Sequence, residues 1–281
     1  MSLDKCRFCR GRRGLALAAA ASLAIGLFGC ASEGEQAVVY VERPIEQIYA
    51  EAWARIDRGE WILAAQQFDE VERQHPYSIW ARRALLMSAY CYYQSNRYEE
   101  AVTTANTFIQ LHPGNEDVPY AYYVKAVSLY EQITDVTRDQ ARTQEALTAL
   151  QDLVQRYPAS EYARDARLKI DLARDHLAGK EMTIGRHYLR SGQTLAAISR
   201  FRNVVENYQT TSHTPEALER LTEAYLTLGL VSEAQSTAAV LGYNYPGSPW
   251  YEDAYALLTD SGAAPIENEQ SWISRTFNSV F

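Results

Sequence analysis

The sequence predicts an all-α protein in which pairs of helices stack into a solenoid. Two series of residues in identical register indicate this. One is a series of alanines, and the other follows each alanine by twelve residues and is proline at four of its five positions. Apolar residues recur between them at helical spacing, and proline ends a helix because it lacks the amide donor. The two series are Ala64, Ala101, Ala146, Ala197 and Ala234, and Pro76, Pro113, Pro158, Gln209 and Pro246.

Each repeating unit is predicted to be two amphipathic helices joined by a tight turn. A residue that favours turns comes five positions before four of the alanines, and a small residue lies farther upstream, where the paired helices must approach closely. The turn residues are Gly59, Asn96, Gly192 and Gly229, and the small residues are Ala52, Ala89, Ala126 and Gly185.

These anchors place the helix pairs at residues 45–75, 79–112, 117–157, 160–208 and 214–245, with a last helix at 249–259. The third unit carries eight extra residues, which we expect as a longer turn at residues 134–141. The fourth carries fourteen extra, and no proline interrupts residues 159–214. Its first helix is therefore expected to reach about 30 residues and to project beyond the regular stack.

This order of small residue, turn, alanine, large apolar residue and proline resembles the tetratricopeptide repeat. The resemblance implies a right-handed superhelix of five helix pairs plus a terminal helix, which we assign to residues 44–260. Residues 261–281 are expected to be a linker and an amphipathic tail. We expect the tail to cap the last unit, and a helix that docks on a partner is the alternative. Its apolar residues are Trp272, Ile273, Phe277, Val280 and Phe281.

The amino terminus predicts a secretory signal at residues 1–29. A basic start precedes an apolar run at residues 15–28, which is too short to span a bilayer. The segment Leu-Phe-Gly-Cys that ends at Cys30 resembles the lipobox of bacterial lipoproteins, which implies a covalent N-acyl diacylglyceryl lipid on Cys30. Residues 30–43 would then be a lipid anchor and a flexible tether. Ala31 after the cysteine implies, by the same resemblance, transport to the outer membrane. No other cofactor is expected.

The charge balance argues against nucleic acid as a partner. The chain has 27 basic and 35 acidic residues, and removal of the signal would leave 22 and 34. Such a surface repels phosphates. Cys6 and Cys9 fall in the predicted signal, so Cys91 would be the one thiol besides the anchor. Because it lies in an apolar helical run, we expect it to be a small buried hydrophobic residue.

No residue pattern typical of catalysis occurs in the sequence. The five histidines are scattered, and His75 and His112 directly precede helix-ending prolines. The pair Glu99 and Glu100 fits a solvated surface. Motifs of metalloproteases, serine hydrolases and nucleotide-binding folds do not occur. We therefore expect a scaffold that binds other proteins, with no enzymatic activity and no metal site.

Four segments carry a more specific resemblance. They are Gly-Glu-Trp at residues 59–61, Gln-His-Pro-Tyr at 74–77, Ala-Tyr-Cys-Tyr-Tyr at 89–93 and Arg-Tyr-Pro-Ala-Ser-Glu-Tyr at 156–162. With the lipobox and the lengthened fourth repeat, they resemble the BamD family, lipoproteins of the β-barrel assembly machinery of bacterial outer membranes. The resemblance implies a periplasmic position on the outer membrane. The implied partners are a BamA-like POTRA domain, the other lipoproteins of the machinery and unfolded outer-membrane proteins.

A different lipid-anchored repeat protein of the envelope is the alternative. It would coordinate peptidoglycan synthesis and cell division, or the assembly of a secretion channel. The repeats and the lipobox alone do not separate these functions.

Two candidate sites follow. In the BamD family an arginine in the second helix of repeat four contacts the POTRA region, and Arg200 matches that position; an exposed arginine without this role is the alternative.

In repeats one to three, the first helices are expected to present an aromatic groove for an extended peptide, because tyrosine offers contact area at a low entropic cost. Ordinary packing between helices is the alternative for these rings. The predicted groove residues are Tyr49, Trp53, Tyr90, Tyr93, Tyr120, Tyr123 and Tyr130.

Overall fold

The structure is a computed structural model that describes residues 42–136 and 138–278. All regular secondary structure in these ranges is α-helical. The predicted signal, Cys30, most of the predicted tether, and Val280 and Phe281 of the predicted tail lie outside the described residues.

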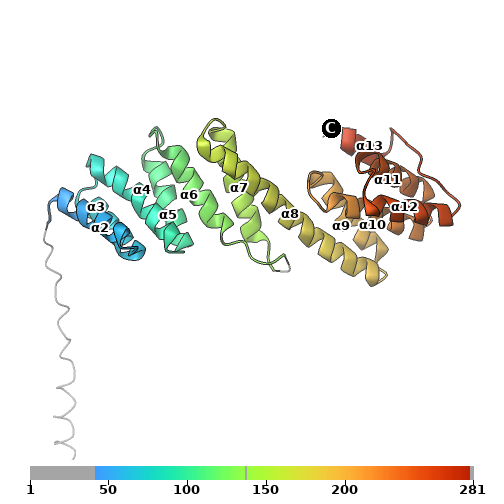
Figure 1. Ribbon diagram of the computed structural model, residues 1–281, viewed down its shortest axis with the longest axis horizontal. Helices are drawn as coiled ribbons and strands as arrows, with labels where there is room; N and C mark the ends of the chain where they lie inside the picture. Colours follow the sequence, from blue (N-terminus) through green and yellow to red (C-terminus); the bar gives the residue numbers. More distant parts are fainter. Residues whose placement is uncertain (1–41, 137, 279–281) are drawn as a thin grey trace, which may run out of the picture. The chain divides into compact units, whose positions relative to one another are not determined.

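Five helix pairs follow one another in the order of the sequence, which confirms the predicted all-α repeat fold (Figure 1). Each helix packs on the next, and the first helices of the first four pairs also contact one another, so that they form a common layer. The pairs are α2 (Ile45–Asp57) with α3 (Trp61–Gln74), α4 (Ile79–Gln94) with α5 (Tyr98–Leu111), α6 (Val118–Tyr130) with α7 (Ala141–Arg156), α8 (Glu161–Arg190) with α9 (Thr194–Asn207), and α10 (Thr214–Thr227) with α11 (Val231–Asn244). Two further helices, α12 (Pro249–Asp260) and α13 (Trp272–Asn278), complete the described chain.

The turns within four of the pairs have the backbone conformation that their residue types predict. Gly59, Gly192 and Gly229 have φ of 71°, 72° and 73°, and Asn96 has φ of 60°. This left-handed region is open to glycine and is tolerated by asparagine. In the third pair, the longer connection between α6 and α7 replaces such a turn, as expected from the extra residues.

The small residues of the repeat lie where the helices cross. All five alanines of the first series are fully buried, as are Ala52, Ala89 and Ala126. Gly185 of α8 meets the ring of Phe201 of α9 so closely that a Cβ atom would lie 2.5 Å from its Cε1. These positions need small side chains because the helix backbones approach one another there.

The long helix α8 has 30 residues, as predicted, but it does not project from the stack. Ala166, Ile170, Ala173 and Leu177 pack in a core cluster with α6 and α7. Ala178, the very next residue, and Met182 belong to a second cluster with α9 to α13. Apolar residues on both halves of α8 thus find neighbours, and α8 is shared by two cores.

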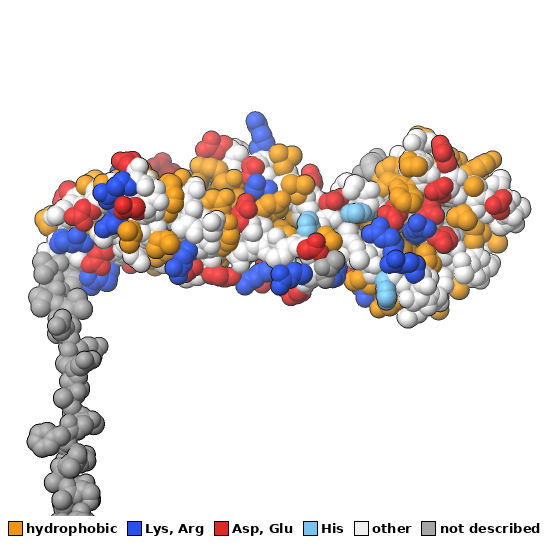
Figure 2. Space-filling view, turned by 60° about the horizontal axis from the view of Figure 1, so that its bottom comes forward, with side chains coloured by type: hydrophobic (Ala, Val, Ile, Leu, Met, Phe, Trp, Pro, Cys, Tyr) orange, Lys and Arg blue, Asp and Glu red, His pale blue; other side chains and the backbone are white. Residues whose placement is uncertain are grey.

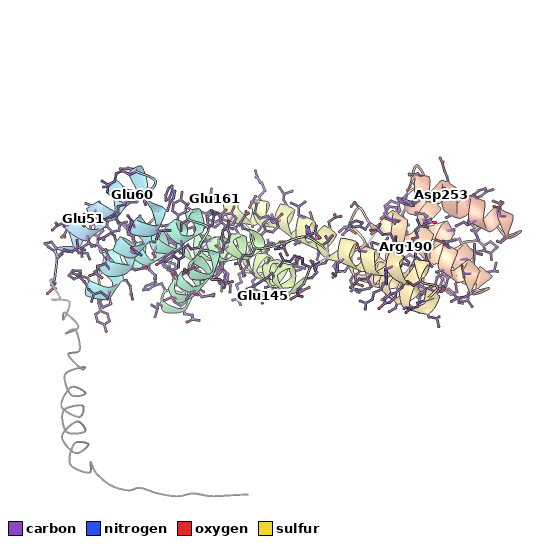
Figure 3. The ribbon with its side chains drawn as sticks, turned by 90° about the horizontal axis from the view of Figure 1, so that it is seen from below. Glu51, Glu60, Glu145, Glu161, Arg190 and Asp253 are labelled. Carbon is purple, nitrogen blue, oxygen red and sulfur yellow. The ribbon has the colours of Figure 1, made fainter. Side chains whose placement is uncertain are left out.

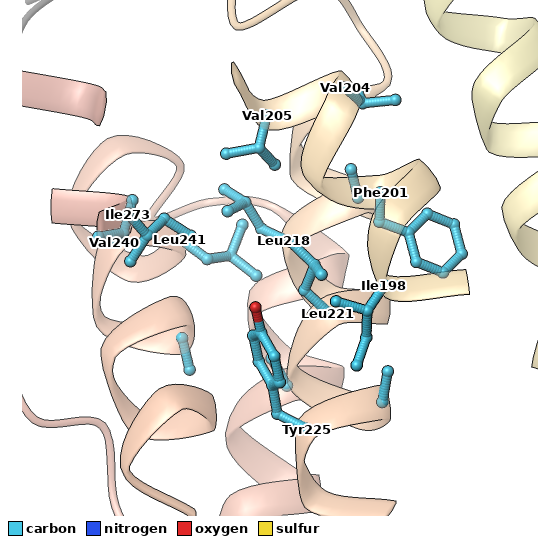
Figure 4. Close-up of a cluster of buried hydrophobic side chains, with 14 of the residues drawn as sticks. Ile198, Phe201, Val204, Val205, Leu218, Leu221, Tyr225, Val240, Leu241 and Ile273 are labelled. Carbon is cyan, nitrogen blue, oxygen red and sulfur yellow. The ribbon is translucent and has the colours of Figure 1, made fainter. Parts of the chain in front are cut away.

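The short helix α13 caps the last repeat. Ile273 and Phe277 are buried in the second core cluster, where Ile273 lies with Val240 and Leu241 of α11 (Figure 4). The guanidinium of Arg202 in α9 lies 4.1 Å from the ring centroid of Trp272. The capping interpretation of the tail is therefore confirmed for its described residues.

A further expectation concerns Cys91. Cys91 is fully buried, and its burial raises the pKa of the thiol to about 12, so it is a hydrophobic core residue as predicted. Among the residues that the structure describes, no helix combines the length and the hydropathy needed to cross a bilayer.

Candidate partner-binding surfaces

The first helices of repeats two to four bring tyrosines together. The ring of Tyr162, at the start of α8, lies 5.4 Å from that of Tyr120 and stacks at 5.1 Å on that of Tyr123, both in α6. Tyr93 of α4 and Tyr120 pack against the same small buried residues. Tyr90 of α4 interacts electrostatically with Tyr93 and Tyr120, and its ring also lies 5.9 Å from that of Trp61 in α3. We call this surface the tyrosine face, and it consists of Tyr90, Tyr93, Tyr120, Tyr123, Tyr130 and Tyr162, all half-buried.

Polar groups of α8 fix the orientation of these rings. The hydroxyl of Tyr123 donates a hydrogen bond of 2.8 Å to Asp165, and burial together with this contact raises the pKa of Tyr123. The hydroxyl therefore stays a donor at any physiological pH. Lys169 pairs with Asp165 at 3.2 Å, and its ammonium group lies 5.3 Å from the ring centroid of Tyr130. Tyr123 is thus held at its hydroxyl, and Lys169 covers one face of the Tyr130 ring, while both rings remain half-buried.

Sequence reasoning missed the contribution of α8 to this surface. Tyr162, Asp165 and Lys169 are spaced by three and four residues, so they share one face of the helix. That spacing was a usable signal, because the first helix of the next repeat must contact the first helix of the previous one.

Tyr49 and Trp53 of α2 lie in a separate aromatic group. The ring of Tyr49 is 5.4 Å from that of Phe68 and 4.8 Å from that of Trp80, and the ring of Trp53 is 6.4 Å from that of Phe68. Tyr49 thus packs between helices, whereas Trp53 remains 41% exposed.

Arg200 lies on the exposed side of α9 in a preformed ion pair. Its Nη1 is 3.2 Å from Oε2 of Glu181 in α8, and its side chain is 41% exposed. The surrounding depression, about 490 Å³, is also lined by Leu195, which is 73% exposed, and by Arg202. Arg202 pairs with Glu206 at 2.7 Å and stacks on Trp272, which links α13 to this surface. Arginine is enriched at protein interfaces, which makes this surface a candidate for one.

The described residues offer no metal centre. In residues 42–136 and 138–278, no group of three or more histidine, cysteine, aspartate or glutamate side chains is arranged to hold a metal ion.

The comparisons with known sequences agree with one another on a single family. The sequence profile of the family described as "YfiO: Outer membrane lipoprotein" matches residues 41–241. A protein of Caulobacter vibrioides named "Outer membrane protein assembly factor BamD" is 56% identical over 260 residues, which cover 92% of this chain and 85% of that protein. A protein of the same name from Rickettsia prowazekii is 47% identical over 240 residues, with coverages of 85% and 95%.

Among solved structures, a tetratricopeptide-repeat protein of Thermus thermophilus matches with a TM-score of 0.35 and 19% identity, covering 76% of this chain and 98% of that one. The fold assignment rests on the helix pairs described above. The region matched by the family profile contains both the tyrosine face and Arg200.

Proposed function

Because the chain belongs to the BamD family of outer-membrane lipoproteins, we propose that it is a scaffold subunit of the β-barrel assembly machinery and not an enzyme. It is held by lipid at the periplasmic face of the outer membrane. It binds the POTRA region of the barrel component and other lipoproteins of the machinery. It also receives unfolded outer-membrane proteins and aids their folding and insertion. The family match over residues 41–241 is the observation that carries this proposal.

Arg200 is the proposed contact with the POTRA region. Its Nη1 is the nitrogen that meets Glu181, and a guanidinium has five N–H donors in a fixed fork. The remaining N–H groups can therefore donate to a carboxylate of the partner without breaking the pair with Glu181. Because Glu181 limits the rotamers of Arg200, less side-chain entropy is lost on binding.

Affinity purification from detergent-solubilised outer membranes tests this contact. The wild-type protein should recover a barrel protein that contains POTRA domains, and Arg200→Glu should recover much less of it. Arg200→Gln removes the charge without placing two acids side by side at Glu181. Arg164→Gln, an exposed arginine of α8, is the matched control. If the wild type recovers peptidoglycan or secretion components and no POTRA protein, the proposed function is wrong.

The tyrosine face is the proposed groove for clients. Half-buried tyrosine rings gathered on one surface offer apolar contact area to an extended segment that carries aromatic side chains. The double variant Tyr90→Ala and Tyr123→Ala should weaken the binding of an aromatic peptide from an outer-membrane strand by about tenfold or more. Tyr77→Ala with Tyr243→Ala, two highly exposed tyrosines outside the face, is the control. Unchanged affinity in the first double variant would refute the groove.

The proposed lipid on Cys30 is tested by mass spectrometry. The mature amino-terminal peptide should carry a diacylglyceryl thioether and an amide-linked acyl chain. Each buried methylene contributes about 0.8 kcal/mol, so two or three chains hold a protein durably on a membrane. Cys30→Ser should abolish both the modification and the co-sedimentation with outer membranes. An unmodified amino terminus on the wild-type protein would exclude the anchor.

A further inference from the structure

The starts of α2 and α4 and the end of α5 meet at one edge of the first two repeats. The ring of Tyr49, in the second turn of α2, lies 4.8 Å from that of Trp80 at the start of α4. Arg82 of α4 and residues 111–116 at the end of α5 line a common depression of about 560 Å³. We call this side the loop edge. The opposite side, the turn edge, carries the turns within the pairs, and Glu60 in Figure 3 marks it.

Three large apolar side chains stand out from the loop edge. Tyr77, in the loop before α4, is fully exposed, and Ile79, the first residue of α4, is 66% exposed. Leu111, the last residue of α5, is 59% exposed. One exposed apolar residue is ordinary, but these three lie on neighbouring helix ends of the same edge. Contact with something outside the described chain would remove them from water.

Two arginines follow these apolar residues on α4. Ile79, Arg82 and Arg83 are spaced by three and four residues, so they share one side of the helix. Both arginines are exposed, and neither forms an ion pair with a carboxylate in residues 42–136 and 138–278. Glu116 also lines the depression. The pKa of His112 there is lowered by burial and by the charge of Arg82, and no acid offsets this effect. Positive charge therefore prevails at this edge.

The acidic total of the chain does not exclude a negatively charged partner at this edge. Basic, acidic and hydrophobic side chains are interspersed over the first repeats, at the left of Figure 2. Charges more than about 8–10 Å away are largely screened at physiological ionic strength, so Arg82 and Arg83 act locally. Tyrosine and aliphatic side chains beside unpaired arginines fit a phospholipid surface, where rings lie among the headgroups and guanidinium groups meet phosphates.

The proposed lipid tether leaves the molecule at the loop edge. Pro44 caps the start of α2. It lies fourteen residues along the chain from Cys30, so the tether holds it within about 50 Å of the bilayer. The turn edge is about 20 Å farther away along α2. Because the lipid makes docking intramolecular, with an effective concentration in the millimolar range, a weakly binding surface is sufficient.

From these observations we propose that the loop edge of repeats one and two docks on the phospholipid surface that holds the anchor. Tyr77, Ile79 and Leu111 lie among the headgroups, and Arg82 and Arg83 donate to phosphates of anionic lipids. The proposal rests on the proposed lipid on Cys30 and adds an orientation to it. Because the helices run from the loop edge to the turn edge, their axes stand steeply on the membrane, and the tyrosine face opens to the side.

Fluorescence quenching on the full lipidated chain tests this docking. Ile79→Cys carries an environment-sensitive fluorophore, and Leu63→Cys carries the same fluorophore as the matched control, because Leu63 is 44% exposed at the turn edge. Cys91 does not compete for the label because it is buried. Each protein is inserted into vesicles of phosphatidylethanolamine and phosphatidylglycerol with nitroxide quenchers on the headgroups. Iodide measures the access of water, and circular dichroism verifies the fold.

The label at residue 79 should be quenched by the nitroxide lipids about fivefold more strongly than the label at residue 63, with the reverse order for iodide. Arg82→Gln with Arg83→Gln should lower the ratio of docked to undocked protein about tenfold or more, since each arginine near an anionic surface contributes roughly fivefold. Vesicles of phosphatidylcholine alone should have the same effect. Arg164→Gln with Arg190→Gln removes two exposed arginines of α8 and should change nothing; Arg190 is marked far from the first repeats in Figure 3.

Three outcomes overturn the proposal in different ways. If the wild-type protein does not float with the vesicles, the anchor is wrong, and the docking fails with it. If the protein floats but the nitroxide lipids quench both labels equally or neither, the anchor stands and the docking surface is refuted. If the label at residue 79 is shielded from iodide in native outer membranes but escapes added nitroxide lipids, a protein covers the loop edge and the assignment to lipid is wrong.

Discussion

Replacement of Gly185 by alanine tests whether the helix crossing between α8 and α9 sets the choice of residue there. The added Cβ would lie 2.5 Å from Cε1 of Phe201 and 2.9 Å from Cδ1 and Cζ. Phe201 is fully buried, so its ring cannot swing into solvent. The helices must separate or the ring must leave its rotamer, which costs about 1–3 kcal/mol.

A gain in helix propensity opposes this cost. Alanine in a helix interior is about 1 kcal/mol more favourable than glycine. For Gly185→Ala we therefore expect a net loss of about 1–2 kcal/mol in the free energy of unfolding. Gly179, six residues earlier in α8, provides the matched control. Its nearest neighbour for a Cβ is Nε2 of His213 at 3.1 Å, on a side chain that is only half-buried. Gly179→Ala should be neutral or slightly stabilising.

Urea unfolding followed by circular dichroism at constant pH measures both variants. The double variant Gly185→Ala with Phe201→Leu makes the cause explicit, because a smaller side chain removes the clash. The loss in the double variant should be smaller than the sum of the single losses, with a coupling of about 1 kcal/mol. Equal stability of the Gly179 and Gly185 variants, or strictly additive losses, would refute the steric explanation.

Three further predictions concern single residues. Burial raises the pKa of Glu219 to about 7, so its ionisation removes stability as the pH rises from about 4.5 through 7. Glu219→Gln should abolish this loss and be more stable than the wild type by about 2–3 kcal/mol at pH 8. If the wild type and the variant show the same change in urea midpoint between pH 5 and pH 8, the prediction is wrong. Asn96→Ala should destabilise the second repeat by about 1 kcal/mol because φ is 60° there, whereas Asn96→Gly should be nearly neutral. Cys91 should not react with a thiol reagent at pH 8 until the protein unfolds in urea, and rapid labelling of the native protein would exclude its burial.

The repeat fold could be predicted from the sequence because few residue types fit its special positions. A turn with positive φ selects glycine or asparagine, a helix crossing selects alanine or glycine, and proline marks the end of the second helix. These constraints act locally, so they are visible in the sequence as the regular spacing of residues such as Gly59, Asn96 and Gly229. The length of α8 followed from the same register.

The sharing of α8 by two cores was not predicted, although the spacing of its apolar residues indicates it. Buried positions follow helical spacing up to Leu177 and then continue from Ala178, so the apolar face turns by about 100° within one residue. A prediction that assumes one apolar face per helix misses such a change of face. The expected projection of α8 was wrong for this reason.

The ion pairs between α8 and α10 were missed for a different reason. Arg186 of α8 meets Glu216 of α10 across 30 residues of sequence. Charged residues on separate helices show no periodic relation to one another, so only the packing of the helices reveals the pair. The same holds for the contact between Tyr123 and Asp165, which joins residues 42 positions apart.

The uninterrupted helix α8 also fixes the distance between the tyrosine face and Arg200. Asp165, which holds the tyrosine face, and Glu181, which holds Arg200, are about 24 Å apart along its axis. Each residue inserted between them would lengthen this spacing by about 1.5 Å and rotate one surface against the other by about 100°. The positions proposed for a client chain on the tyrosine face and for a partner at Arg200 are therefore set by the number of residues between them, and a change in the length of this helix would alter both.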